Sequence, residues 1–137
     1  MKNFPVREGL WGISPTTSKP YLLGSRCPEC QGYQFPKKRV CPVCFSNHME
    51  EVSLSTRGRI YTYTINRQGS AGLYVPYATV YVDLPEDVRV FAQSDLSRWE
   101  HGTPVIGKEV ELVIGPIGGD GHGNQIIGIQ FNPVPGA

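Results

Sequence analysis

Four cysteines in two close pairs are the feature that most constrains this chain. They form the motifs Cys27-Pro28-Glu29-Cys30 and Cys41-Pro42-Val43-Cys44, which are separated by ten residues. Two Cys-x-x-Cys pairs at this spacing can arrange four thiolates as a tetrahedron around one ion, and thiolate ligands suit zinc. We therefore predict one structural Zn²⁺ in a small zinc ribbon, bound by Cys27, Cys30, Cys41 and Cys44.

The compartment expected for the chain favours a metal site over disulfide bonds. Residues 1–8 contain no apolar targeting region, and no uncharged apolar run is long enough to cross a bilayer. We expect a cytoplasmic protein, in which thiols stay reduced. Iron in a rubredoxin-like site, two disulfides or a redox-active pair remain alternatives. A closed site of four protein ligands leaves no position for water, so the zinc would stabilise the fold and not catalyse.

Composition favours short strands over helices. The 137 residues include 16 Gly and 12 Pro, enough to interrupt helices at short intervals. A chain of this length forms one domain or two small modules that pack together. The formal net charge of +1 provides no overall field that would recruit nucleic acid or an anionic membrane.

Three segments follow one another along the chain. Residues 1–24 carry Pro5, Pro15 and Pro20, and predict an extended, irregular arm with at most a short helix. Residues 25–50 hold the zinc ribbon, and residues 51–137 the C-terminal domain. Residues 46–56 are expected to form a polar connector. The apolar residues of the arm would pack on its own core or on a partner; they are Leu10, Trp11, Tyr21, Leu22 and Leu23.

Alternating apolar and polar residues predict five strands after the ribbon, at residues 58–65, 77–84, 88–92, 109–114 and 125–131. Pro85-Glu86-Asp87 is typical of a hairpin turn, and residues 94–100 favour one helical turn capped by Ser94 or Asp95. Five short strands of this kind predict a five-stranded OB-fold barrel. The fold class is then mainly β: an N-terminal extended arm, a rubredoxin-like zinc ribbon and a C-terminal OB-fold.

No catalytic residues are predicted. Once the four cysteines are assigned to metal, no thiol remains as a nucleophile, and no nucleophile elbow or phosphate loop is present. The three histidines lie in polar, turn-like sequence where surface positions are expected: His48, His101 and His122. The glycine-rich run of residues 115–124 lies between two predicted strands and is interpreted as a flexible hairpin loop, not a phosphate cradle.

Aromatic and basic residues of the C-terminal domain allow two further interpretations. They could form a base-stacking face, as OB barrels that bind single strands do, or serve a β-core or a protein interface. The low net charge favours the interface, and a nucleic-acid-binding module is the alternative function. The residues concerned are Tyr61, Tyr63, Tyr74, Tyr77, Tyr81, Phe91, Arg57, Arg59 and Arg67.

The order of these features resembles the acyl-CoA-associated zinc-ribbon and OB-fold family known as domain of unknown function thirty-five. The resemblance covers roughly residues 22–131, and its most specific part is Gly58-Arg59-Ile60-Tyr61-Thr62-Tyr63-Thr64 directly after the ribbon. Among its members, this chain is similar in outline to the small subunits of the benzoylsuccinyl-CoA thiolase kind. The chain departs from the family in two ways. The family commonly has a helical arm, whereas Pro15 and Pro20 predict an extended one, and Gln31 and Phe45 stand where Gly commonly follows each knuckle.

The resemblance implies a non-catalytic accessory subunit in a hetero-oligomer with a thiolase-fold enzyme of thiolase or retro-aldolase type. Some members of the family contact CoA, so acyl-CoA bound jointly with the partner is a second expectation. Cations are needed to bind the phosphates of CoA. The candidates nearest in sequence are Lys37, Lys38, Arg39, Arg57 and Arg59, for which a solvated surface is the competing interpretation.

Overall fold

Five strands form the larger lobe of the computed structural model, which describes residues 3–5, 9–68, 72–119 and 121–134. They are β6 (Arg57–Asn66), β7 (Tyr77–Asp83), β8 (Arg89–Ser94), β9 (Glu109–Gly119) and β10 (Gln125–Pro133). Each overlaps one of the five predicted strands. Alternation along β7, for example, directs Ala78, Val80 and Val82 into the core.

The five strands close into a barrel with OB-fold connectivity. Strands β6, β7 and β8 form an antiparallel meander, and β8 pairs in parallel with β10 at Gln93 and Gln130. Strand β10 pairs antiparallel with β9, and β9 returns to β6, where Glu111 lies opposite Arg57. The predicted fold class is confirmed.

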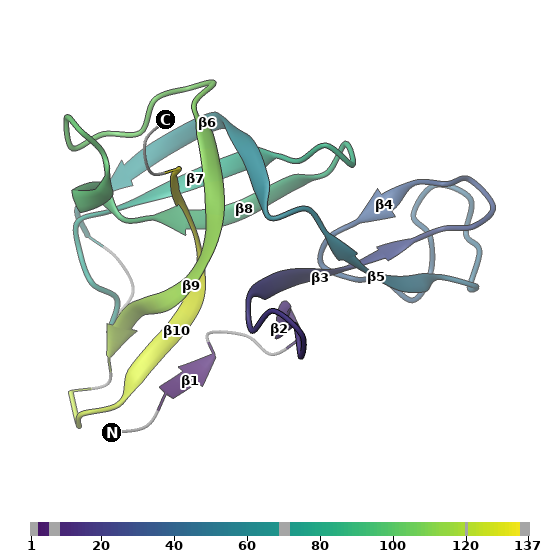
Figure 1. The fold of residues 1–137 in the computed structure, drawn as a ribbon, viewed down its shortest axis with the longest axis horizontal. Coiled ribbons are helices and arrows are strands. Elements are labelled where there is room, and N and C mark those ends of the chain that lie inside the picture. Colours follow the sequence, from purple (N-terminus) through teal and green to yellow (C-terminus); the bar gives the residue numbers. More distant parts are fainter. Residues whose placement is uncertain (1–2, 6–8, 69–71, 120, 135–137) are drawn as a thin grey trace.

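A second, smaller lobe carries the cysteines and lies beside the barrel (Figure 1). Its strands are β2 (Trp11–Ile13), β3 (Pro20–Arg26), β4 (Tyr33–Gln34) and β5 (Glu50–Leu54). Strand β3 pairs antiparallel with each of the other three. We call residues 9–56 the ribbon lobe. The segment expected to be a polar connector, residues 46–56, therefore contains strand β5. Its polar sequence did not predict a strand, and the strand forms because β3 supplies partners for its backbone hydrogen bonds.

The described part of the N-terminal segment contains strands, which corrects the expectation of an irregular arm. Strand β1 (Asn3–Pro5) pairs in parallel with residues 125–127 of β10, and β2 and β3 form a hairpin. Pro15 lies in the turn of that hairpin and Pro20 is the first residue of β3, two positions where proline removes no ladder hydrogen bond. Prolines that suggested irregular chain instead mark strand ends.

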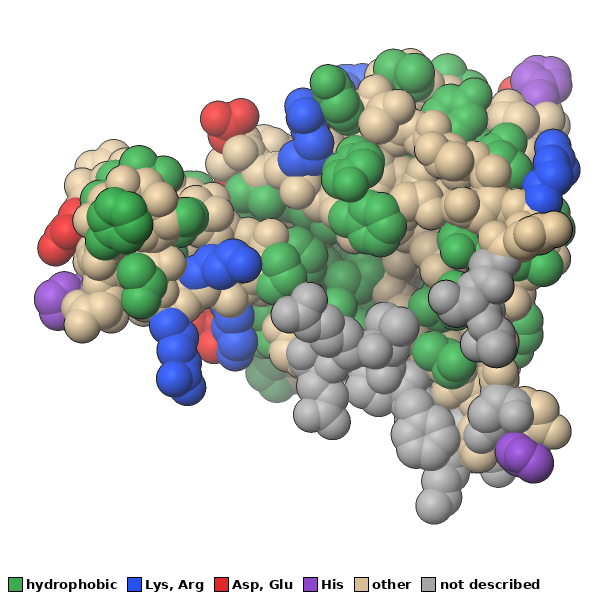
Figure 2. Space-filling view, turned by 180° about the vertical axis from the view of Figure 1, so that it is seen from behind, with side chains coloured by type: hydrophobic (Ala, Val, Ile, Leu, Met, Phe, Trp, Pro, Cys, Tyr) green, Lys and Arg blue, Asp and Glu red, His purple; other side chains and the backbone are tan. Residues whose placement is uncertain are grey.

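One hydrophobic core joins the two lobes. Leu22 of β3 and Leu54 of β5 are buried in the same cluster as Val80, Val110 and Phe131 of the barrel. Leu10 and Trp11 pack against that cluster. The apolar residues of the arm therefore cover the chain's own core in large part. Hydrophobic side chains nevertheless remain on the surface of both lobes, as the rear view shows (Figure 2).

The β9–β10 hairpin is longer than predicted. Residues 115–119, expected in a flexible loop, continue β9 as far as Gly119, while the hairpin connection itself is confirmed. Gly118 faces the backbone of Gly72 so closely that any added Cβ would overlap the Gly72 carbonyl oxygen. Glycine in this strand thus permits a close approach of two backbones, which local sequence did not reveal.

The remaining local predictions agree with the structure. Asp87 N–H donates to the Leu84 carbonyl in the β7–β8 turn, and Asp95 caps a 3-10 turn, Leu96–Arg98. In the described part of the chain, no helix is long and apolar enough to cross a membrane.

Candidate metal centre

Four cysteine sulfurs converge at the far end of the ribbon lobe. The Sγ atoms of Cys27 and Cys44 are 3.4 Å apart, those of Cys30 and Cys41 are 3.5 Å apart, and all four lie within 4.8 Å of one another. Both short distances exceed the roughly 2.05 Å of a disulfide bond, so the cysteines are free thiols. Four thiolates about 2.3 Å from a central zinc ion stand roughly 3.8 Å apart, so this donor set fits zinc.

Each pair sits on a tight turn with the same backbone hydrogen bonds. Gln31 N–H donates to the Cys27 carbonyl at 2.7 Å, and Phe45 N–H donates to the Cys41 carbonyl at 2.9 Å. Gln31 and Phe45 have φ of 64° and 63°, in the left-handed region that favours glycine. These two residues, which stand where the family commonly has Gly, therefore keep the glycine-like backbone of the knuckles. Cys27 directly follows β3, which anchors the first knuckle to the lobe.

Backbone N–H groups stabilise the first thiolate of each pair. Those of Cys44 and Val43 lower the pKa of Cys41 to about 7, and the pKa of Cys27 is also lowered, chiefly by the N–H of Cys30. Ser46 N–H lowers the pKa of Cys44, but the Cys27 thiol and burial outweigh it and raise this pKa to about 12. Thiolates this close repel one another, so full ionisation needs a cation among them. A metal with four protein ligands would stabilise the lobe and leave no open position for substrate.

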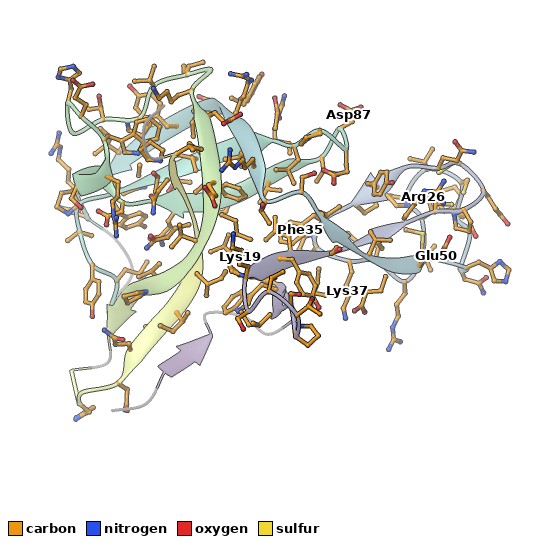
Figure 3. The ribbon with its side chains drawn as sticks, in the orientation of Figure 1. Lys19, Arg26, Phe35, Lys37, Glu50 and Asp87 are labelled. Carbon is orange, nitrogen blue, oxygen red and sulfur yellow. The ribbon has the colours of Figure 1, made fainter. Side chains whose placement is uncertain are left out.

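The five cations predicted to contact CoA lie in two separate places. Lys37, Lys38 and Arg39 line a groove of about 720 Å³ on the ribbon lobe, together with Met49 and Glu51. Lys37 Nζ lies 3.0 Å from the Glu51 carboxylate, and the adjacent pair Arg26 and Glu50 is 3.7 Å apart (Figure 3). Among the residues that the structure describes, neither Lys38 nor Arg39 forms an ion pair.

The other two cations belong to the barrel. Arg57 and Arg59 line a pocket of about 390 Å³ beside Asp83. Arg57 lies 3.6 Å from Glu109 and 3.5 Å from Glu111, so its charge is already balanced. The structure therefore does not bring the five predicted residues together in one pocket.

The predicted aromatic face divides between surface and interior. Tyr61, Tyr81 and Phe91 are exposed on the outside of the barrel, with Tyr81 and Phe91 rings 5.3 Å apart. Tyr63 instead packs against the core. Arg89, absent from the prediction, stacks 3.4 Å from the Tyr61 ring centroid and pairs with Asp83 at 2.7 Å. Only the β7–β8 register places Arg89 there, opposite Asp83. The three histidines are exposed, as predicted.

Family models match both parts of the chain. One described as "ChsH2, rubredoxin-like zinc ribbon domain" covers residues 18–50, and one described as "ChsH2, C-terminal OB-fold domain" covers residues 51–115. A solved structure titled "Ltp2-ChsH2(DUF35) aldolase" is similar in fold, with a TM-score of 0.61 and 21% identity over 81% of this chain and 84% of that one.

Curated relatives match most of the chain. A protein named benzoylsuccinyl-CoA thiolase subunit BbsA from Thauera aromatica is 38% identical, covering 84% of this chain and 78% of the relative. Its namesake from Geobacter metallireducens is 41% identical over 84% of this chain and 76% of the relative. A DUF35 domain-containing scaffold protein from Pyrococcus furiosus is 36% identical over 82% of this chain and 83% of the relative. This chain therefore belongs to the ChsH2-type DUF35 family, in which a rubredoxin-like zinc ribbon precedes an OB-fold domain.

Proposed function

We propose that this chain is a non-catalytic, zinc-binding accessory subunit of a thiolase-fold acyl-CoA enzyme. The single observation that carries the proposal is the similarity, over 84% of the chain, to two proteins named as subunits of benzoylsuccinyl-CoA thiolase. The relative named as a scaffold protein is consistent with a supporting role. In this proposal Cys27, Cys30, Cys41 and Cys44 bind one structural Zn²⁺, in keeping with the convergence of their sulfurs.

The chemistry of the chain supports placing the reaction in the partner. Thiolase-type acyl transfer needs an activated nucleophile and an acid–base group close to it. The chain has four cysteines, all within the metal centre, and its histidines are exposed on separate segments. A large subunit would therefore supply the catalytic groups, and this chain would support its structure and its acyl-CoA site.

Contact with acyl-CoA is the finer part of the proposal. Lys38 and Arg39 are the best candidates for the phosphates, because they are exposed beside a groove and belong to none of the described ion pairs. Arg57 is less suited, since Glu109 and Glu111 already balance it. Binding of nucleic acid needs cations that are available to phosphates. Arg57 is already paired with glutamates and Arg89 is paired with Asp83 at the aromatic face, which weakens the nucleic-acid alternative.

Co-expression with the thiolase-fold proteins of the source organism tests the proposal. We expect one of them to co-elute with this chain in size-exclusion chromatography, and its thiolytic activity on acyl-CoA to depend on the complex. Benzoylsuccinyl-CoA is the first substrate to test. The chain alone should show no turnover. Separate elution at micromolar concentration, together with equal activity of the large subunit alone, would show that the proposal is wrong.

Titration of the complex with CoA tests the finer part. Changing Lys38 and Arg39 to Ala should weaken CoA binding, and changing Arg57 to Ala is the matched control. Equal affinity of all three proteins for CoA would show that Lys38 and Arg39 do not bind the phosphates.

A further inference from the structure

The two zinc knuckles have the same backbone hydrogen bonds, but the side chains of the first are polar and those of the second are apolar. In both, the N–H of the first cysteine donates to the carbonyl five residues further on: Cys27 to the Gly32 carbonyl at 2.9 Å and Cys41 to the Ser46 carbonyl at 2.8 Å. In this common pattern, Glu29 of the first knuckle corresponds to Val43 of the second, and Gln31 corresponds to Phe45. All four of these side chains are exposed.

The polar first knuckle shows that the turn does not require apolar residues. Val43 is 70% exposed and Phe45 is 78% exposed, so neither contributes appreciably to the core. Phe45 also holds a left-handed φ of 63°, a conformation that a bulky residue adopts at a cost and that glycine adopts freely. An exposed aromatic residue at an unfavourable backbone position indicates a role outside the fold of the chain.

We infer that Val43 and Phe45 form an apolar anchor that docks into the thiolase-fold partner. The inference rests on the proposed function and adds to it the surface of contact. Aromatic residues are enriched in the cores of protein interfaces, and a few buried anchors carry most of the binding energy, so Phe45 would be the main anchor and Val43 would add apolar contact area. The anchor alone is too small for a stable complex, so it would be one part of a larger interface.

The charges near the anchor predict what kind of partner surface would bind it. Val40, three residues before Val43 in the sequence, is 49% exposed and lines the groove that also holds Lys38 and Arg39. An apolar socket with an acidic rim would complement this arrangement. The same rim would repel Glu29 of the first knuckle, so it would also decide which knuckle enters the socket.

A protein socket fits better than an anionic membrane. Residues 25–50 contain four Lys or Arg residues and two glutamates, a net charge of +2. A zinc ion with four thiolates has a net charge of −2, so the zinc-loaded segment is close to neutral. Attraction of a peripheral protein to anionic lipid needs a clear excess of cations. The anchor is also confined to two side chains, a small area for insertion into a bilayer.

Transfer of the polar pair of the first knuckle to the second tests the inference. The double variant Val43→Glu/Phe45→Gln should retain zinc and its circular dichroism spectrum, because the first knuckle already carries these residues on the same backbone. Its Kd for the co-purifying thiolase-fold subunit, measured by titration calorimetry, should rise at least tenfold. The matched control is Glu29→Ala/Gln31→Ala, which should bind as the unchanged chain does.

A second variant separates docking from folding. Phe45→Gly relieves the backbone at φ 63° and removes the ring, so we expect equal or higher thermal stability and weaker binding of the same subunit. If the unchanged chain and both knuckle-two variants bind the subunit equally, the inference is wrong and the proposed function stands. If the unchanged chain binds no thiolase-fold subunit, both are wrong. Sedimentation with phosphatidylserine vesicles that depends on Phe45 would assign the anchor to a membrane and contradict the inference.

Discussion

Glu86 and Ser55 join the barrel to the ribbon lobe. The Oε2 atom of Glu86, in the β7–β8 turn, accepts hydrogen bonds from both the backbone N–H and the hydroxyl of Ser55, each at 2.8 Å. Ser55 lies between β5 and β6, where the chain passes from one lobe to the other. The contact therefore bridges a junction that the common hydrophobic core also crosses.

Removal of the Glu86 carboxylate should loosen this junction. We expect Glu86→Ala to lower the free energy of unfolding by about 1–3 kcal/mol, since the Ser55 N–H loses a charged acceptor. Ser55→Ala should cost less, about 1 kcal/mol, because it removes one hydroxyl bond only. Urea denaturation measures both. The other oxygen, Oε1, is buried and has no partner among the described residues, which offsets part of the gain; a more stable Glu86→Ala protein would mean that this offset dominates.

The purified protein should contain about one zinc ion per chain. Cys41→Ser should abolish zinc binding and unfold the ribbon lobe, because binding of a structural zinc ion is coupled to folding. Acidification should release the metal, since protons compete with it for the thiolates. Elemental analysis and far-ultraviolet circular dichroism provide the measurements. Iron in place of zinc, or a metal-free protein with disulfides, would contradict the prediction.

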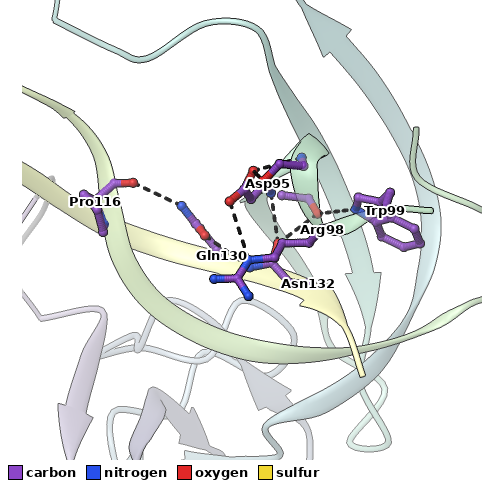
Figure 4. Close-up of polar contacts among 8 residues, drawn as sticks. Asp95, Arg98, Trp99, Pro116, Gln130 and Asn132 are labelled. Carbon is purple, nitrogen blue, oxygen red and sulfur yellow. Dashed lines mark hydrogen bonds and ion pairs between the residues drawn. The ribbon is translucent and has the colours of Figure 1, made fainter. Parts of the chain in front are cut away.

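Buried polar groups at one end of the barrel should act as a unit. Trp99 Nε1 donates to Ser94 Oγ at 2.8 Å, and Ser94 Oγ in turn donates to Asn132 Oδ1 at 3.2 Å (Figure 4). Asn132 Oδ1 also accepts from the Asp95 N–H at 2.9 Å. Ser94→Ala should destabilise the protein by about 1–3 kcal/mol, because the buried indole N–H loses its acceptor.

A double-mutant cycle tests this coupling. In Trp99→Phe the indole donor is absent, so adding Ser94→Ala should then cost less than it does alone. Thermal unfolding of the four proteins provides the comparison. Additive effects would indicate that the hydrogen bond between Trp99 and Ser94 contributes little to stability.

A side chain at Gly58 should destabilise the barrel. A Cβ atom there would lie 2.5 Å from the Asp83 carbonyl oxygen and 2.7 Å from Val82 Cγ1, both on the adjacent strand. We expect Gly58→Ala to cost about 1–3 kcal/mol of stability through overpacking. Gly115→Ala in β9 is the control, because its Cβ would meet nothing nearer than 4.0 Å. Equal melting temperatures of the two variants would contradict this explanation of Gly58.

Much of the metal centre and of the barrel follows from local sequence. The spacing of the cysteines predicted which four thiols converge, because each Cys-x-x-Cys turn brings two sulfurs together by itself. Alternation predicted the five barrel strands because one face of each is buried. The cations named for CoA stay a prediction, and only the structure divides them between the groove of Lys38 and the separate pocket of Arg57.

Long-range pairing accounts for what local sequence could not predict. The polar residues of β5 form a strand only because β3 lies beside them, and Leu22 is buried only because the barrel core extends into the ribbon lobe. The segment boundaries predicted at residues 24 and 50 remain a prediction, although β3 and β5 run across them.

The sequence by itself determined the donor set of the metal centre and the number and order of the barrel strands, because periodicity and ligand spacing act within a few residues. Only the tertiary structure decided that the knuckles are equivalent in backbone while Phe45 is exposed, that Arg89 stacks on Tyr61, and that Glu86 reaches Ser55. The contacts of Arg89 and Glu86 depend on strand register and barrel closure, which are set by packing between residues far apart in the chain.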